Sequence, residues 1–324
     1  MMSGKIRSRA SALLAGTALL AAAACGAGNA QTSKGQDGTQ EVVAAFYPLQ
    51  WVTERVGGTD IRVTGLTAPG VEPHDLELSP QQVAQLGGAS LSVYIKGVQP
   101  AVDEAVEQHA ADRSFDAATA VKTLAAQEHT EEHAGEHAEE HAGEHSEEPG
   151  HDHEVSYDPH LWLDPSRLAT VATALGERLA KADPAHAEGY RQRAATTAGE
   201  LTALDGELAK GLATCSSKTL VTSHEAFGYL ADRYHLKQVG IVLDPESEPS
   251  PTRIAEVAKL AKQEKVTTIF TEALVSPKVA EVLAGEVGAK TAVLDPLESQ
   301  PSGGDYLSAM RTNLQTLRTA LGCS

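Results

Sequence analysis

The sequence predicts an α/β fold of two similar lobes, each with a parallel sheet flanked by helices, joined by a long rigid helix. Three observations support this prediction. Short apolar runs alternate with helical patterns from residue 41 to 110, and the same alternation returns from residue 219 to 321. Two long helical patterns, at 165–182 and 184–212, separate these stretches. Alternation of strands with helices is typical of parallel α/β architecture.

The first alternation forms the predicted N-terminal lobe, which we place at 41–165. Ser79 and Pro80 mark one helix start, because serine is a favoured N-cap and proline fits the first helical turn. Strands are predicted at 41–48, 61–67 and 91–95, and helices after Pro48, from Pro80 and at 101–110.

The connection between the lobes is predicted at 166–214. Both long helical patterns of this region begin at an Asp-Pro pair, which is a signal for a helix start. Leu201, Leu204 and Leu208 recur at helical spacing in the second pattern. One of these two helices is therefore the candidate for the rigid link.

The second alternation forms the predicted C-terminal lobe, which we place at 215–324. A proline-rich stretch at 244–251 interrupts it and predicts a loop. Strands are predicted at 219–223, 238–243, 266–270 and 291–294, and helices at 225–234, 252–264, 276–288 and 306–321.

The N-terminus has the pattern of an export signal. Three basic residues precede an apolar run over 10–24, which is long enough for a signal-peptide core. Small residues before Cys25, with glycine after it, indicate a lipoprotein cleavage site, although ordinary cleavage beside a stray cysteine is the alternative. We expect a signal peptide at 1–24, a lipid on Cys25, a flexible tether at 25–40 and an extracytoplasmic location, anchored to the cell membrane or in the periplasm.

Charge and cysteine content limit the partners and the compartment. The net charge of −18 argues against nucleic-acid binding and suits a protein that handles cations. Apart from Cys25, the chain has only Cys215 and Cys323. In an exported protein such a pair predicts a disulfide; the alternative is a soft metal site, which the lack of CxxC spacing disfavours.

Three polar side chains follow predicted strands from both lobes. His74 lies in the loop after strand 61–67, His224 directly follows strand 219–223, and Asp295 directly follows strand 291–294. Ligands of parallel α/β sheets bind beyond the carboxyl ends of the strands, so these side chains can converge on one crevice. Each would be an ordinary loop residue if taken alone. The other isolated histidines are expected to be structural or solvated: His109, His186 and His235.

The segments around these residues resemble a known family. They read EPHDLELSP, DPHLWLDP, SHEAFGYLADRYHL, FTEALVSPKVAEVL and LDPLES, in this order. Together they resemble the metal-specific solute-binding lipoproteins of ABC importers, in particular the ZnuA-like zinc-binding family of the TroA-like superfamily. The resemblance runs from about residue 41 to 324. It implies two lobes with a metal held in the cleft between them.

The resemblance also implies a ligand set. It assigns imidazole ligands to His74, His160 and His224, and a carboxylate ligand to Asp295. Three imidazoles with one carboxylate suit Zn²⁺, and manganese-binding members carry glutamate at the position of His224. Some zinc-binding members use water or a nearby glutamate in place of Asp295. We expect Glu72 to be a spare oxygen donor and Glu272 to support a ligand or lie at a hinge.

The segment 128–153 is unusually rich in histidine and acid. Seven of its 26 residues are histidine and ten are Asp or Glu. Five of the histidines recur every four residues, so that neighbouring pairs could chelate a metal ion on one helical face; glycine and charge repulsion oppose that helix. We expect auxiliary zinc capture, with a charged spacer as the alternative, by His129, His133, His137, His141, His145, His151 and His153.

These observations predict a binding protein rather than an enzyme. We expect a monomer that captures Zn²⁺ outside the cytoplasm and delivers it to an ABC permease with its ATPase; a zinc metallochaperone is a further candidate partner. The alternatives are a periplasmic or extracellular zinc chaperone and a Mn²⁺-binding adhesin-type lipoprotein. A zinc hydrolase with Glu225 as its base is disfavoured, because a fourth ligand leaves no open position for water.

Overall fold

The computed structural model describes residues 39–126, 155–245 and 247–324. All of these residues belong to one compact unit. The predictions for the signal peptide, Cys25 and the histidine-rich segment 128–153 lie outside the described residues.

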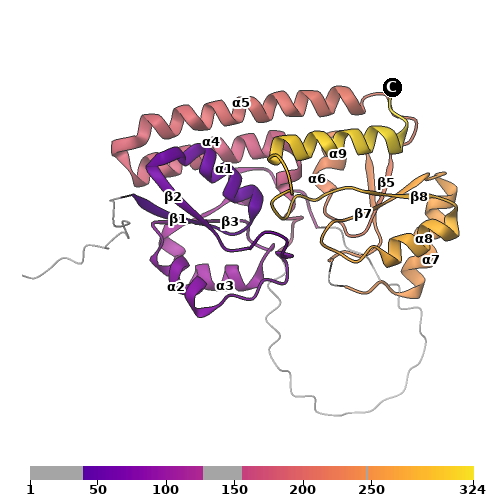
Figure 1. Ribbon diagram of the computed structural model, residues 1–324, viewed down its shortest axis with the longest axis horizontal. Coiled ribbons are helices and arrows are strands. Elements are labelled where there is room, and N and C mark those ends of the chain that lie inside the picture. The colour runs from indigo at the N-terminus through magenta and orange to yellow at the C-terminus, as the bar shows by residue number, and fades with distance from the viewer. Residues whose placement is uncertain (1–38, 127–154, 246) are drawn as a thin grey trace, which may run out of the picture. The chain divides into compact units, whose positions relative to one another are not determined.

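The described chain contains two parallel four-stranded sheets (Figure 1). In the first sheet the order is β2-β1-β3-β4, and every neighbouring pair is parallel. Its strands are β1 (Gln40–Ala44), β2 (Ile61–Gly65), β3 (Leu91–Tyr94) and β4 (Ser114–Asp116). Strand β4 was not predicted, because its three residues carry no apolar run.

The second sheet repeats the same topology in the order β6-β5-β7-β8, again with parallel neighbours. Its strands are β5 (Thr219–Thr222), β6 (Lys237–Gly240), β7 (Thr268–Thr271) and β8 (Lys290–Val293). In each sheet, the second strand along the chain lies on one side of the first strand and the third lies on the other. This reversal makes a topological switch point, where parallel α/β proteins bind ligands. The predicted fold class of two parallel α/β lobes is therefore confirmed, whereas the predicted domain boundaries stay a prediction.

The helices of the first sheet begin where proline and capping residues predict. They are α1 (Tyr47–Gly57), α2 (Pro80–Gly88) and α3 (Pro100–His109). Ser79 caps α2 through a reciprocal capping box with Gln82, which satisfies two backbone N–H groups at the helix start. Pro48 lies in the first turn of α1, which is why β1 ends four residues earlier than the sequence pattern suggested.

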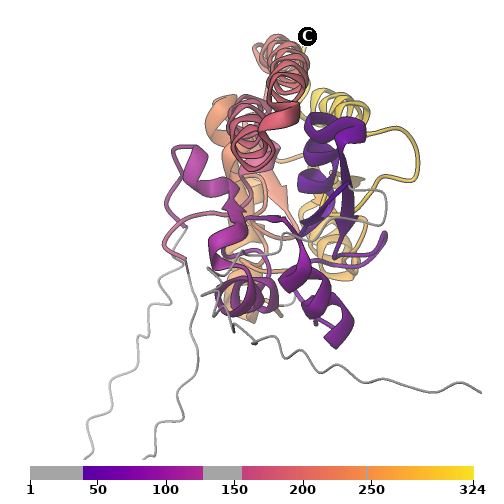
Figure 2. The ribbon, with the colours of Figure 1, turned by 90° about the vertical axis from the view of Figure 1, so that its left-hand side faces the viewer.

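Two long helices lie side by side and connect the sheets (Figures 1 and 2). These are α4 (Pro165–Ala182) and α5 (Ala187–Leu212), which pack along each other. Helix α5 also packs against α1, which connects β1 to β2 of the first sheet, and against the C-terminal helix α9 (Tyr306–Leu321). The link is thus a helical pair.

The second sheet carries three shorter helices, α6 (Gly228–Arg233), α7 (Pro251–Gln263) and α8 (Lys278–Val287). Helix α6 begins at Gly228, later than the helix predicted at 225–234. The reason lies at His224, whose N–H donates to Glu272 and whose carbonyl accepts from Thr222. These bonds hold the backbone away from a helical course directly after β5.

The buried apolar side chains form two clusters. The larger one runs from the first sheet through α4 and α5 to α9 and includes Phe46, Trp162 and Tyr306. The smaller one lies between the second sheet, α7 and α8. Cys215 and Cys323 form a disulfide that joins the chain after α5 to the chain after α9, as the sequence predicted.

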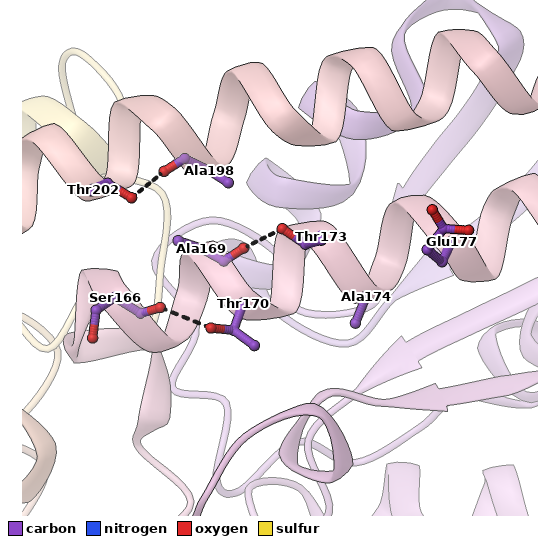
Figure 3. A pocket seen from close by; sticks show the side chains of 8 residues that line it. All are labelled: Ser166, Ala169, Thr170, Thr173, Ala174, Glu177, Ala198 and Thr202. Carbon is purple, nitrogen blue, oxygen red and sulfur yellow. Dashed lines mark hydrogen bonds between the residues drawn. The ribbon is translucent and has the colours of Figure 1, made fainter.

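A surface hollow of about 540 Å³ lies between α4 and α5 (Figure 3). Thr170, Thr173 and Thr202 line it, and each hydroxyl donates to a carbonyl one turn earlier in its own helix. These hydroxyls are therefore already satisfied, and no histidine lines the hollow.

Among the helices of residues 39–126, 155–245 and 247–324, none has the length and apolar character to cross a membrane.

Candidate metal centre

Four side chains from distant parts of the chain meet at one point. They are His74, His160, His224 and Glu298, and one possible ligand atom of each lies within 4.8 Å of the others. The three imidazole centroids form a triangle with sides of 5.4, 5.4 and 5.9 Å. Three of the four predicted ligands, His74, His160 and His224, are thereby brought together.

His74 and His160 reach the group from loops. His74 follows β2, and its backbone N–H donates to Glu72 Oε1 at 3.2 Å, which fixes the loop locally. His160 precedes the short 3₁₀ helix Leu161–Leu163, which leads into α4. Asp158 Oδ1 accepts hydrogen bonds from both the backbone N–H of His160 (2.9 Å) and its Nδ1 (2.8 Å). Asp158 therefore sets the orientation of the His160 ring.

His224 and Glu272 meet because two neighbouring strands end together. Strands β5 and β7 are parallel, and Thr222 is in register with Phe270. The residues two positions later are His224 and Glu272, so strand pairing itself places them side by side. Glu272 Oε1 accepts from the backbone N–H of His224 at 3.0 Å, and Oε2 pairs with Nδ1 at 2.6 Å. Glu272 thus orients the His224 ring, and its role beside a metal ligand stays a prediction.

Glu298 supplies the carboxylate of the group, in place of the predicted Asp295. Glu298 is almost completely buried, with 1% of its side chain exposed. Asp295 Oδ1 instead accepts the backbone N–H of Leu297 at 2.8 Å, and Asp295 is not a member of the group. Asp295 was predicted because it directly follows a strand. In the structure, the turn between the two acids directs Glu298 toward the three imidazoles.

The distances suit a tetrahedral site. Glu298 Oε1 lies 3.3 Å from His74 Nε2, 3.5 Å from His224 Nε2 and 3.9 Å from His160 Nε2. In a tetrahedron with metal–ligand bonds of about 2.0–2.2 Å, two ligands are about 3.3–3.6 Å apart. The separations of Glu298 from His74 and His224 thus already match those of a tetrahedral Zn²⁺ site, and its separation from His160 is longer.

The hydrogen bonds at Nδ1 leave Nε2 of two rings free to bind a cation. Because Asp158 and Glu272 accept from the Nδ1 atoms of His160 and His224, the neutral form of each ring has its lone pair on Nε2. Both Nε2 atoms, and Glu298 Oε2, are buried without a hydrogen-bond partner among the described residues. Buried polar atoms without partners are uncommon in native proteins, and here a cation at the centre would satisfy them.

The buried carboxylates favour the protonated form of the neighbouring imidazoles when no cation is bound. Burial alone would lower the pKa of His224, but its hydrogen bond to Glu272 and the nearby carboxylate of Glu298 raise that pKa well above its ordinary value. His74 follows the same pattern: burial opposes its charge, and Glu298 raises its pKa. Burial would raise the pKa of Glu298, yet the two imidazoles hold it well below its usual range. Binding of a dication must therefore displace protons from the imidazoles.

Glu72 lies beside this group and is not one of the four, so its role as a spare oxygen donor stays a prediction. Burial, followed by the charge of Glu298, raises the pKa of the Glu72 carboxyl to about 7. Its Oε1 holds the backbone of His74, and Oε2 is buried without a hydrogen-bond partner.

Zinc affinity should fall steeply on acidification. An imidazolium must lose its proton before it can bind zinc. Below the raised pKa, each such group therefore raises the apparent zinc dissociation constant by about tenfold for each unit of pH. Because the pKa values of His74 and His224 are both raised, the slope of log Kd against pH should approach about −2. Chelator competition between pH 5 and 8, with calorimetry in buffers of different ionisation enthalpy, measures both the slope and the protons released. A flat profile would contradict protonation of the site.

His186 and Glu225 make contacts outside the four-residue group. His186 is exposed and pairs with Asp183. Glu225 accepts from the backbone N–H of Gly240 and lies 3.6 Å from Arg253. It therefore joins β6 to α7 and is not a member of the four-residue group.

Two important residues were not predicted, Glu298 and Asp158. Asp158 has a signal in the sequence, because an aspartate two residues before a histidine can accept its backbone N–H and its ring N–H together. Glu298 stands in the quoted LDPLES segment, but nothing in the pattern distinguishes it from Asp295.

Comparison with known proteins gives consistent matches. Residues 42–320 match the family described as "Zinc-uptake complex component A periplasmic". The chain is 35% identical to the zinc-binding lipoprotein AdcA of Streptococcus pneumoniae serotype 4 over 318 residues, which cover 95% of this chain and 60% of that protein. The chain thus spans 60% of the length of this relative.

Solved structures are similar as well. The Zn(II)-bound ZnuA-like domain of S. pneumoniae AdcA matches 88% of this chain and 99% of that domain, at 31% identity and a TM-score of 0.69. The laminin-binding protein Lmb of Streptococcus agalactiae, described as a bifunctional protein with adhesin and metal transporting activity, matches 87% of this chain and 99% of its own, at 32% identity and a TM-score of 0.72.

Proposed function

Because the chain belongs to the family of periplasmic A components of zinc-uptake complexes, we propose that it captures Zn²⁺ outside the cytoplasm and delivers it to an ABC-type importer. The single observation that carries this proposal is the convergence of three imidazoles and one carboxylate on a buried point. Zn²⁺ is the cargo of this site.

The donor chemistry supports zinc over harder cations. Zinc sites use imidazole nitrogen and carboxylate oxygen in four-coordinate tetrahedra, whereas Mn²⁺ favours oxygen-richer shells. His224 is completely buried and is held by both oxygens of Glu272, so it presents Nε2 in a fixed direction. A nitrogen donor at this position shifts the set toward zinc.

The function is binding without catalysis. Catalytic zinc sites keep a position open for water, whereas four protein donors would close this shell. His74 comes from the loop after β2 of the first sheet, while His224 and Glu298 come from loops of the second. Movement of one sheet relative to the other would remove donors and release the ion to a permease that is driven by an ATPase.

The N-terminal and histidine-rich segments extend this proposal. A lipid on Cys25 would hold the protein at the membrane, beside the permease; the S. pneumoniae relative is named as a lipoprotein. The segment 128–153 would raise the local zinc concentration through its seven histidines and ten acids. Neither role is needed for the tight site itself.

Native mass spectrometry tests the proposal. The purified mature protein, titrated with Zn²⁺, Mn²⁺ or Cu²⁺, should retain one Zn²⁺ tightly and further zinc ions weakly. Deletion of residues 128–153 should remove the weak ions and leave the tight one, because the four donors lie elsewhere in the chain. Competition with a chelator of known affinity ranks the metals.

Two results would overturn the proposal. Loss of the tight ion on deletion of 128–153 would place the principal site in that segment. Tighter retention of Mn²⁺ than of Zn²⁺ would favour a manganese-binding lipoprotein instead. Transport is tested separately: cells that lack the gene should need more zinc for growth, and a chaperone role predicts no loss of zinc uptake.

A further inference from the structure

We propose that Asp295 is a positioning residue for Glu298: its carboxylate closes the turn that aims Glu298 at the three imidazoles. The inference rests on the proposed function, because it assigns Glu298 to the zinc site. It gives Asp295 a role different from the ligand role that the sequence suggested.

The turn contains an unusual backbone conformation at Leu297, the residue before Glu298. Leu297 has φ of 59°, in the left-handed region that non-glycine residues rarely adopt, and its side chain is completely buried. Its backbone N–H donates to Asp295 Oδ1 at 2.8 Å. Aspartate commonly accepts the backbone N–H two residues later, which stabilises tight turns.

Asp295 is itself held from the neighbouring helix. Asn313, in the middle of α9, is buried and pairs with both backbone groups of Asp295. Its Oδ1 accepts the N–H of Asp295 at 3.1 Å, and its Nδ2 donates to the carbonyl at 2.6 Å. The turn therefore starts from a fixed point on α9.

The remaining residues of the turn are fixed as well. Trp162 Nε1 donates to the carbonyl of Pro296 at 2.7 Å, and Trp162 lies two residues after the ligand His160. Ser299 Oγ accepts the backbone N–H of Gly70 at 2.6 Å, in the loop that carries His74. The turn is thus tied to the segments that carry two of the imidazoles.

This arrangement leaves the Glu298 carboxylate pointing at the imidazole nitrogens. Its Oε1 lies within 3.9 Å of all three Nε2 atoms, and its Oε2 has no hydrogen-bond partner among the described residues. Without the acceptor of Asp295, the N–H of Leu297 loses this bond, and the left-handed conformation loses its local support. Glu298 would then spend less time in the orientation that closes the zinc shell.

A matched pair of variants separates positioning from charge. Asp295→Asn removes the charge but keeps an oxygen that can accept from Leu297, so zinc affinity should stay within about threefold of the parent protein. Asp295→Glu keeps the charge but lengthens the side chain, so the turn should be disturbed. Loss of a group that orients a metal ligand typically weakens binding by about 10- to 100-fold, which is the expected effect of Asp295→Glu. Zinc dissociation constants from chelator competition give the answer.

A double-mutant cycle shows whether the effect passes through Glu298. Glu298→Gln alone should weaken zinc binding. Asp295→Glu should have almost no further effect in the Glu298→Gln background, because there the orientation of residue 298 contributes little. Ser250→Ala is a control: it also removes a side-chain acceptor for a backbone N–H, at the start of α7, and should leave zinc affinity unchanged.

The outcomes distinguish the inference from the proposed function. Unchanged zinc binding in Asp295→Glu, greater loss in Asp295→Asn than in Asp295→Glu, or additive effects in the cycle would each overturn the positioning role. Unchanged binding in Glu298→Gln would instead remove Glu298 from the proposed site. Circular dichroism of each metal-free variant confirms that the folded chain is being compared.

Discussion

His224→Ala should weaken zinc binding by more than about 100-fold, since even loss of a residue that only supports a ligand costs about 10- to 100-fold. His224 is the most deeply buried imidazole of the group, with no exposed side-chain surface, and both oxygens of Glu272 orient it. Its removal would delete one of four donors and leave the carboxylates of Glu272 and Glu298 without their imidazole partner. Chelator competition, monitored by a zinc-sensitive dye, measures the change.

His186→Ala is the matched control for this prediction. His186 is half exposed and pairs with Asp183 at the surface, so its removal should leave zinc affinity unchanged. A similar loss of affinity in the two variants would show that the four-residue group is not the tight site.

Replacing Cys215 and Cys323 with serine should lower the free energy of unfolding by about 4–5 kcal/mol, because the disulfide closes a long loop and restricts the unfolded chain. The two cysteines are 108 residues apart in sequence. They join the chain after α5 to the chain after α9 and take no part in the four-residue group. Urea denaturation measures the loss, and zinc affinity at native conditions should be retained.

Reductant provides the control for the disulfide. Dithiothreitol should destabilise the parent protein by a similar amount and leave the double-serine variant unaffected. If reductant changed neither protein, the bridge would contribute nothing to stability, and the loop-closure argument would be wrong for this chain.

Several features could be read from the sequence because they depend on local chemistry. Pro80 with Ser79 marked the start of α2, and the Asp-Pro pairs marked the long helical link. Apart from Cys25, the sequence has only Cys215 and Cys323, so these two cysteines could be predicted to pair. His74 and His224 were identified by their positions after strands, since the carboxyl ends of parallel strands lie at one edge of a sheet.

Other features depend on contacts that the sequence pattern does not encode. Strand β4 has three residues without apolar periodicity, and it forms only because β3 offers it a partner. Helix α6 starts late because His224 forms its hydrogen bonds with Glu272, 48 residues away.

The choice between Asp295 and Glu298 shows where the boundary lies. By itself the sequence determined that an acidic residue after β8 would join histidines from distant loops, since residue type and position after a strand are local properties. Only the tertiary structure decided which acid points inward. That choice depends on Asn313 of α9, Trp162 and a left-handed Leu297, which together fix the direction of a turn, and no spacing of residue types records a direction.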